Sequence, residues 1–461
     1  MLKAEGFGFK TRTPISNDPF EFVCYTFVDD TDLVHSPSSE ATLESLCIEM
    51  QSVLDHWEGG LHASGGALVP SKSYWYLISF KWHNDRWTYR TIADTPGSLA
   101  IFDTNRTRVT LDRLEASEAR ETLGVCLAMD GNQQAEYEKL RQIACRWAEQ
   151  VRCGQLSTAE AWFSLNQTIM KTLEYPLMAT CLTFSQCNNI MQTLLKAALP
   201  KLHIAMSFPK VARFGPRRLQ GLGIPHLWTT QGIEKLWAIF RHGDDHTITG
   251  FQIRSSIEYY LLELGLPGQL FSYPYSTLKH LATPSWITSL WEFVSTKGFL
   301  LSDAIPTIPL KCLEDKFLTE AFLLNQPNKT DLRLANLCRQ WLRVLRISDI
   351  SSGDGKHIID QFWHGTAQCS LNSAYDWPRT EKPSAAAWRA WRFLLSHISH
   401  GPSHIFNQPL GMWTEQAASG NEAEWKYSDS DNRLYHRTLG TTHVYTSVSG
   451  RATRRPRFTY A

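Results

Sequence analysis

The sequence lacks the motifs that mark several common enzyme classes. Its ten cysteines include no Cys-x-x-Cys pair, so neither a zinc ribbon nor a disulfide framework is indicated, and reduced thiols are expected. No Gly-x-x-x-x-Gly-Lys, Gly-x-Ser-x-Gly or His-Glu-x-x-His occurs. The signatures of P-loop nucleotide binding, of serine hydrolases and of zinc proteases are therefore missing.

Long apolar runs are also missing. No stretch of eighteen consecutive apolar residues occurs, and the first residues, Met1 to Gly6, contain no apolar core like that of a signal peptide. We therefore expect no membrane partner and an intracellular location, nuclear or cytoplasmic.

Net charge is nearly absent, since the sequence contains 46 Lys and Arg residues and 45 Asp and Glu residues, for a formal charge of +1. A dedicated nucleic-acid binder is usually more basic, so any attraction of phosphates would be local. The length of 461 residues, 43% of them hydrophobic, is sufficient for two or three domains. The seventeen tryptophans favour core packing over base stacking.

Two adjacent carboxylates, Asp29 and Asp30, lie between apolar β-forming residues in the stretch Cys24–Val34. This pattern predicts a strand, a tight turn and a returning strand with the acids at the tip. Carboxylate oxygens are the ligands that Mg²⁺ prefers, and such ions neutralise charge in phosphoryl transfer. For an isolated pair, a solvated turn is the alternative.

The surroundings of this pair resemble the polymerases of retrotransposons without long terminal repeats. Phe27-Val28-Asp29-Asp30 is similar to the aromatic-x-Asp-Asp hairpin of reverse transcriptases. The block from Gly59 to Lys72 resembles the family's next block, which ends in a lysine, and Leu123-Gly124 resembles its Leu-Gly turn. The three blocks occur in the family's order, and the likeness covers residues 20–230.

The resemblance implies a set of roles and partners. Asp29 would be the principal Mg²⁺ ligand and Asp30 its neighbour, so both would be catalytic. Lys72 would donate a proton to the departing pyrophosphate, with an exposed lysine at a strand start as the alternative. Leu123 and Gly124 would grip the primer. The implied partners are an RNA template, a DNA primer and deoxynucleotides, and the oligomeric state stays open.

The sequence departs from the family ahead of the hairpin. In the family, the fingers and the first catalytic aspartate precede the Asp-Asp hairpin by many tens of residues, whereas 28 residues precede Asp29 here. The acids Glu5, Asp18 and Glu21 do not match the family's pattern. We therefore expect a truncated RNA-directed DNA polymerase, inactive alone, and leave its status as an enzyme open. The alternatives are a non-catalytic nucleic-acid-binding protein derived from such an element and a structural helical protein.

The expected fold class is α+β. Residues 1–130 would form a partial palm with an antiparallel sheet, a helix over 42–57 that ends at the following Gly-Gly pairs, and hairpins that turn at 83–85 and 103–107. Residues 131–300 would form a helical thumb and its extension, beginning with helices over 136–151, 158–172 and 181–199.

Four cations gather after the third of these helices, namely Lys210, Arg213, Arg217 and Arg218. Because Gly215-Pro216 disfavours a helix, we expect a loop that contacts nucleic-acid phosphates. A solvated basic loop is the alternative.

A boundary is predicted in residues 297–309, where prolines interrupt the helical pattern. Residues 301–461 would then form a helical C-terminal region with a basic tail. Trp388-Arg389-Ala390-Trp391-Arg392 alternates aromatic and basic residues, a hairpin is predicted around Ser428–Asn432, and the tail carries Arg451, Arg454, Arg455 and Arg457.

Overall fold

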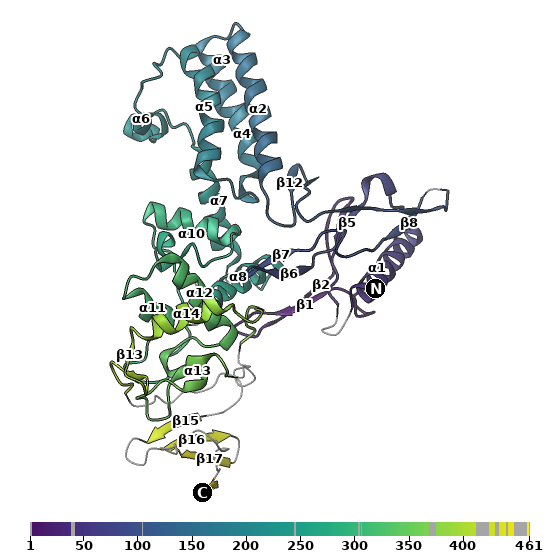
Figure 1. Ribbon diagram of the computed structural model, residues 1–461. Helices are drawn as coiled ribbons and strands as arrows, with labels where there is room; N and C mark the ends of the chain where they lie inside the picture. The colour runs from purple at the N-terminus through teal and green to yellow at the C-terminus, as the bar shows by residue number, and fades with distance from the viewer. Residues whose placement is uncertain are drawn as a thin grey trace. The chain divides into compact units, whose positions relative to one another are not determined.

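The computed structural model confirms the α+β class (Figure 1). The chain divides into two compact units. The structure describes residues 2–37, 42–103, 105–243, 246–302, 305, 307–367, 375–411, 424–428, 433–438, 441–446 and 459–460, the last four ranges by their backbone. Unit 1 comprises Met1–Thr11, Pro19–Gly250 and Pro284–Lys297, and unit 2 the rest. One boundary, Lys297 to Gly298, falls inside the predicted break.

The strands of unit 1 pair two by two. Five of these pairs join neighbouring strands: β1 (Phe9–Arg12) with β2 (Pro19–Phe22), β3 (Cys24–Phe27) with β4 (Asp30–Leu33), β6 (Phe80–His83) with β7 (Arg86–Tyr89), β8 (Ala100–Phe102) with β9 (Arg108–Thr110), and β11 (Arg120–Thr122) with β12 (Val125–Leu127). The sixth pair joins β5 (Tyr74–Tyr76) to β10 (Asp112–Leu114) in parallel. The expected antiparallel pairing is confirmed for the four hairpins β3–β4, β6–β7, β8–β9 and β11–β12, whereas the pairing of β5 with β10 is parallel.

The two predicted hairpins of this region are confirmed. The first joins β6 to β7 through Asn84 and Asp85, both at positive φ, as a two-residue type I′ turn requires. In the second, β8 pairs with β9 around a loop in which the Asp103 carboxylate accepts hydrogen bonds from the Asn105 and Thr107 amides.

The amphipathic helix covers the strands as predicted, but it is longer. Helix α1 spans Leu43–Ala63, and the Thr42 side chain caps its start by accepting from the Ser45 amide. The helix continues through Gly59-Gly60, so that pair does not end it as predicted. It ends before Gly65, where φ is +85°. Glycine is intrinsically unfavourable inside a helix, so the neighbouring helical turns must keep Gly59-Gly60 in the helical conformation.

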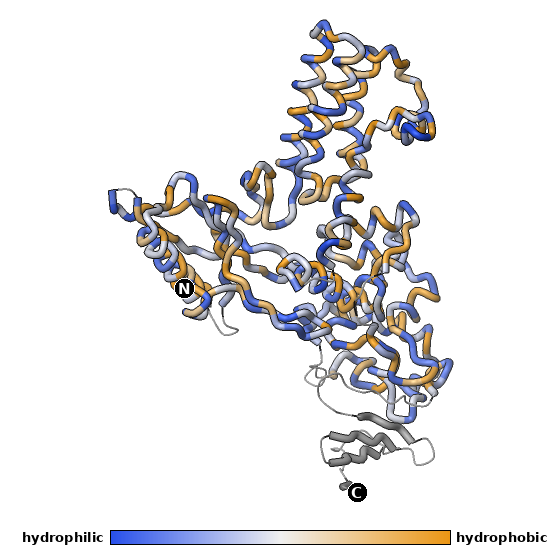
Figure 2. The backbone as a smooth tube through the Cα atoms, turned by 180° about the vertical axis from the view of Figure 1, so that it is seen from behind, coloured by the Kyte–Doolittle hydropathy of each residue, from blue (hydrophilic) through white to orange (hydrophobic). Residues whose placement is uncertain are grey.

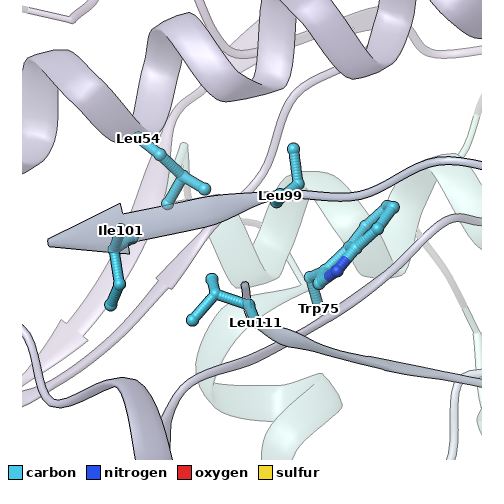
Figure 3. Packing of buried hydrophobic residues seen from close by; sticks show 5 residues of the cluster. All are labelled: Leu54, Trp75, Leu99, Ile101 and Leu111. Atoms are coloured by element: carbon cyan, nitrogen blue, oxygen red, sulfur yellow. The ribbon is translucent and has the colours of Figure 1, made fainter. Parts of the chain in front are cut away.

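The core of this region joins residues from helix α1 and from strands far apart in sequence. Figure 3 shows the side chains that meet there: Leu54, Trp75, Leu99, Ile101 and Leu111. Leu33, from the strand after the Asp-Asp turn, packs against the same cluster. The hairpin is thus anchored by its inward face.

The three helices predicted over residues 136–151, 158–172 and 181–199 are confirmed. They are α2 (Gln134–Cys153), a continuous stretch of α3 (Thr158–Phe163), η2 (Ser164–Ile169) and α4 (Met170–Glu174), then η3 (Tyr175–Met178) and α5 (Phe184–Lys201). Segment η2 is a π-helical turn, in which Ser164 accepts a hydrogen bond from the Trp147 indole at 2.9 Å. Helices α2 and α5 pack side by side (Figure 1), and Figure 2 shows hydrophobic and hydrophilic residues alternating along these helices.

Helix α7 (Leu227–His242) connects this group to α10 (Trp286–Lys297). A Cβ atom on Gly232 would lie 2.3 Å from the Phe293 ring. Only glycine therefore permits the observed approach of α7 to α10.

The described part of unit 2 is mainly helical. Its elements are α8 (Ile248–Leu264, of which Phe251 onward belongs here), η5 (Leu270–Ser272), α9 (Tyr275–Leu278), α11 (Leu318–Leu323), α12 (Lys329–Leu342), η6 (Ile347–Ile350), α13 (Asp360–His364), α14 (Ala385–Leu395), β13 (Ser399–His400) and β14 (Ile405–Phe406). No helix in the described ranges has both the length and the apolar character needed to cross a membrane.

The alternation of tryptophan and arginine lies on α14, where it builds core. Trp388 and Trp391 are buried, and the Trp391 indole donates to the Phe362 carbonyl at 2.9 Å. These two rings are therefore not available to stack on bases.

The C-terminal hairpin is confirmed by its strands. β15 (Glu424–Ser428) pairs with β16 (Arg433–Thr438), and β17 (Thr441–Thr446) and β18 (Thr459–Tyr460) extend the sheet. The predicted turn after Ser428 and the arginines at 451, 454, 455 and 457 lie outside the described residues.

A buried polar group stabilises the centre of unit 2. Arg339 on α12 is fully buried and donates to the carbonyls of Leu262, Glu263 and Val344. The Glu263 carboxylate accepts from the hydroxyl of Thr283 at 2.6 Å and from its amide at 3.2 Å. Burial raises the pKa of Glu263 to about 7, although Thr283 and Arg339 oppose the shift.

This pKa predicts the pH dependence of a substitution. The folded state holds the Glu263 proton up to about pH 7, whereas the unfolded chain releases it near the ordinary glutamate pKa of 4.5, so stability falls as the pH rises through this window. We expect Glu263→Gln to raise the free energy of unfolding at pH 8 by on the order of 2–3 kcal/mol. Urea unfolding at pH 5 and pH 8 measures this gain.

The control is Glu381→Gln, which changes an exposed glutamate of the same unit. It should alter stability at neither pH. A gain for Glu263→Gln of equal size at pH 5 and pH 8 would contradict the titration of Glu263.

Candidate active site and nucleic-acid interface

The Asp-Asp pair lies at the tip of a hairpin, as predicted. Phe27 pairs with Asp30 at the end of the β3–β4 ladder, so Val28 and Asp29 form a two-residue turn. Asp29 is exposed in that turn, and Asp30 is the first residue of β4. Val28 has a φ of +58° and is 84% exposed, a conformation that is strained for a β-branched residue.

The strand alternation brings together a different pair of acids. Asp30 and Asp32 are two residues apart on β4, and their side chains therefore share one face of the hairpin. Burial raises the pKa of Asp32, and the charge of Asp30 raises it further. Asp32 was missed in the sequence, although the alternation through Asp30-Thr31-Asp32 was its signal.

The carboxylates of this tip are the candidate ligands for Mg²⁺. A two-metal site needs ligands that hold ions about 4 Å apart, and a single hairpin offers them from one side only. Within the described ranges, no three His, Cys, Asp or Glu side chains gather closely enough to hold a metal ion. The donor set here thus does not fit a two-metal centre, and we derive no catalytic step through one.

Lys72 is not joined to these acids. It ends the short η1 helix (Pro70–Lys72), and its amide donates to the Val69 carbonyl while its side chain is exposed. Within the described part of the chain, no ion pair links Lys72 to a carboxylate. The proton-donor role stays a prediction.

Leu123 and Gly124 form the turn between β11 and β12. Both have positive φ, at +49° and +79°, as a type I′ turn requires. The Leu123 carbonyl accepts from the Tyr175 hydroxyl at 2.8 Å, and the Gly124 carbonyl accepts from Lys139 at 2.7 Å. Side chains from η3 and α2 therefore hold the backbone of this turn, while the Leu123 side chain stays 43% exposed.

The basic segment after α5 is partly helical, which corrects the prediction of a loop. Helix α6 covers Lys210–Phe214 and the 3₁₀ turn η4 covers Arg217–Leu219. Gly215-Pro216 ends the first turn of helix without preventing it. The backbone then returns on itself, since a Cβ on Gly221 would lie 2.1 Å from the Gly215 carbonyl oxygen.

The four predicted cations divide into two pairs. Arg213 donates to the carbonyls of Met206 at 2.6 Å and Phe208 at 2.8 Å, and the Arg217 guanidinium lies 5.3 Å from the Trp162 ring. These two stabilise the segment. Lys210 and Arg218 are exposed, and neither forms an ion pair with another described residue.

Lys297, which the sequence did not indicate, is a further cation close to His226, as Lys210 is. Burial lowers the pKa of His226, and the charges of Lys297 and Lys210 lower it further. His226 stacks on the 56% exposed ring of Phe184, with centroids 5.4 Å apart and planes at 9°. Lys297 is far from Lys210 in the sequence, so its approach to His226 follows only from the packing of α10 against α7.

The comparisons leave the family undecided. No family model, curated protein or solved structure matches this chain. The likeness to reverse transcriptases therefore rests on the three sequence blocks and their order.

The strained turn predicts the effect of a glycine at position 28. Because a left-handed conformation costs a residue with a Cβ about 1–2 kcal/mol, Val28→Gly should stabilise the hairpin by about 1 kcal/mol, net of the added chain entropy. Amide hydrogen exchange along β3 and β4 should slow by about fivefold. Val28→Ala retains a Cβ and should give a smaller effect, and faster exchange in the glycine variant would contradict the strain.

Proposed function

We propose that this chain is part of an RNA-directed DNA polymerase of a retrotransposon without long terminal repeats, carrying the Asp-Asp hairpin and the thumb. The observation that carries the proposal is the exposed two-residue turn with Asp29 in it and Asp30 directly after it. Carboxylates in such a position would supply one side of a Mg²⁺ site, and the remaining ligands would have to come from another strand.

The helical part of unit 1 would hold the template–primer duplex. Lys210 and Arg218 are free to contact backbone phosphates, which bind cations without regard to base sequence. Lys297 adds charge near Lys210, and Phe184 offers an exposed ring beside them. The type I′ turn at Leu123-Gly124 would contact the primer strand, fixed by Tyr175 and Lys139.

The reaction of the intact polymerase is nucleotidyl transfer. The primer hydroxyl gives up its proton to solvent and attacks the α-phosphorus, the bond from this phosphorus to the bridging oxygen of the pyrophosphate breaks, and Lys72 is the proposed donor of a proton to the departing pyrophosphate. Mg²⁺ ions supply charge neutralisation in that reaction. Residues of this chain would orient the duplex and contribute carboxylates from one side of the centre.

A second candidate is a nucleic-acid-binding protein without catalysis. The limited carboxylate set favours it, because phosphate binding by Lys210 and Arg218 does not need a metal. The two candidates predict the same binding, and only extension of a primer by the chain would decide between them.

Binding is tested by removing the two free cations. We expect Lys210→Ala with Arg218→Ala to weaken binding to an RNA–DNA duplex of any sequence, and to reduce the salt slope by about 0.7–0.9 for each lost contact. Fluorescence titration between low and moderate salt gives both quantities.

The charge-matched control is Lys356→Ala with Lys382→Ala, which removes two exposed cations of unit 2. It should leave the slope unchanged. Equal affinity and slope in the Lys210 and Arg218 variant would indicate a solvated segment, which was the alternative in the sequence.

Catalysis is tested by primer extension with the chain as printed. Because the candidate metal ligands among the described residues come from one hairpin, we expect no product on an RNA template with Mg²⁺ or Mn²⁺. Asp29→Ala is the control for contaminating polymerase. Extension by the unmodified chain that disappears in this control would show a working centre and reject the binding-only candidate.

A further inference from the structure

Unit 1 contains a lysine in an environment that does not suit its charge. Lys235 lies on α7 and has no exposed surface. Its ammonium nitrogen is 3.0 Å from the Ser289 hydroxyl oxygen, 3.4 Å from the Cys181 sulfur and 5.3 Å from the centre of the Trp286 ring. Among the described residues, no carboxylate forms an ion pair with it.

This environment favours the neutral amine. Taking an ammonium out of water is costly unless an opposite charge compensates, and Ser289 and Trp286 are both neutral. Burial accordingly lowers the pKa of Lys235, against an opposing effect of Cys181. A neutral lysine amine has a free electron pair and is a nucleophile.

The sulfur beside this amine is held in place. Cys181 precedes α5 and is a free cysteine, and its amide donates to the Gln133 side chain at 3.1 Å. The neighbouring Leu182 backbone both donates to and accepts from the Gln231 side chain on α7, at 3.0 Å in each case. Gln231 is one helical turn from Lys235, so the same helix fixes both sulfur and nitrogen.

Cys181 is also the accessible thiol of this site. It is partly exposed, whereas nearby Cys187 is fully buried and burial raises the pKa of its thiol to about 12. A small oxidant that enters from solvent would therefore react with Cys181 first, since the reaction follows exposure and thiolate character.

We propose that Cys181 and Lys235 form a reversible covalent sulfur–nitrogen link when the protein meets hydrogen peroxide. The Cys181 sulfur attacks one peroxide oxygen, the O–O bond breaks, and sulfenic acid and one water form. The Lys235 amine then attacks the sulfur, the S–O bond breaks, and the hydroxyl leaves as a second water with a proton from the nitrogen. In sum, one thiol, one amine and one peroxide give one sulfenamide and two waters.

The link would fasten the segment before α5 to α7, which packs on α10. These elements now meet through hydrogen bonds of Gln231 and Lys235 and through the packing of Phe293 on Gly232. The covalent bond would hold these two elements together, and thiols would reverse it by attack on the sulfur. The proposal is independent of the proposed polymerase function.

Peptide mass spectrometry of the full chain tests the link. After peroxide treatment and digestion by a protease that does not cleave at lysine, we expect a joined peptide that contains Cys181 and Lys235. Its mass should be lower than the sum of the two peptides by two hydrogen atoms. Dithiothreitol should return both separate peptides.

Three variants establish the assignment. Cys181→Ser and Lys235→Met should each reduce the joined peptide to background, and the first is conservative enough to keep the fold. Cys187→Ala should retain it. A Cys181 sulfinic acid with an unmodified Lys235, a Cys181–Cys187 disulfide, or a joined peptide that persists in Cys181→Ser would overturn the proposal.

Discussion

Helix α7 can approach α10 only because residue 232 is glycine, and the helical part of unit 1 depends on that approach. With Phe293 seated against the Gly232 backbone, Lys235 is brought to Ser289 on α10. The same packing brings Lys297 into the neighbourhood of His226 and Lys210. One close contact between helices thus creates both the buried lysine site and the third cation of the candidate nucleic-acid interface.

The geometry of a two-residue turn governs the candidate active site in a similar way. The turn exposes Asp29 and begins β4 at Asp30, and strand alternation then places Asp32 beside Asp30. A hairpin of this length can present carboxylates at one point but cannot surround an ion. Any metal chemistry at this tip needs ligands from another strand, which is why binding and catalysis are separable for this chain.

The sequence alone determined the local structure. Helical periodicity predicted the helices between residues 134 and 201, and turn residues predicted the hairpins at Asp29, Asn84 and Asp103, because these signals act between residues a few positions apart. Its errors were also local in origin. Gly59-Gly60 was expected to end a helix, and Gly215-Pro216 was expected to prevent one, because of the intrinsic preferences of these residues. In the structure α1 continues through the first pair, and α6 forms directly before the second, where the backbone crosses itself.

Only the tertiary structure decided which residues meet. Three contacts join residues whose spacing carries no periodic signal. They are the parallel pairing of β5 with β10, the hydrogen bonds from Arg213 to carbonyls and the position of Arg217 on Trp162. Lys235 and Cys181 are 54 positions apart and belong to different elements. Their chemistry depends on burial and on a contact of 3.4 Å, and both arise from the packing of whole helices rather than from the local pattern of either sequence segment.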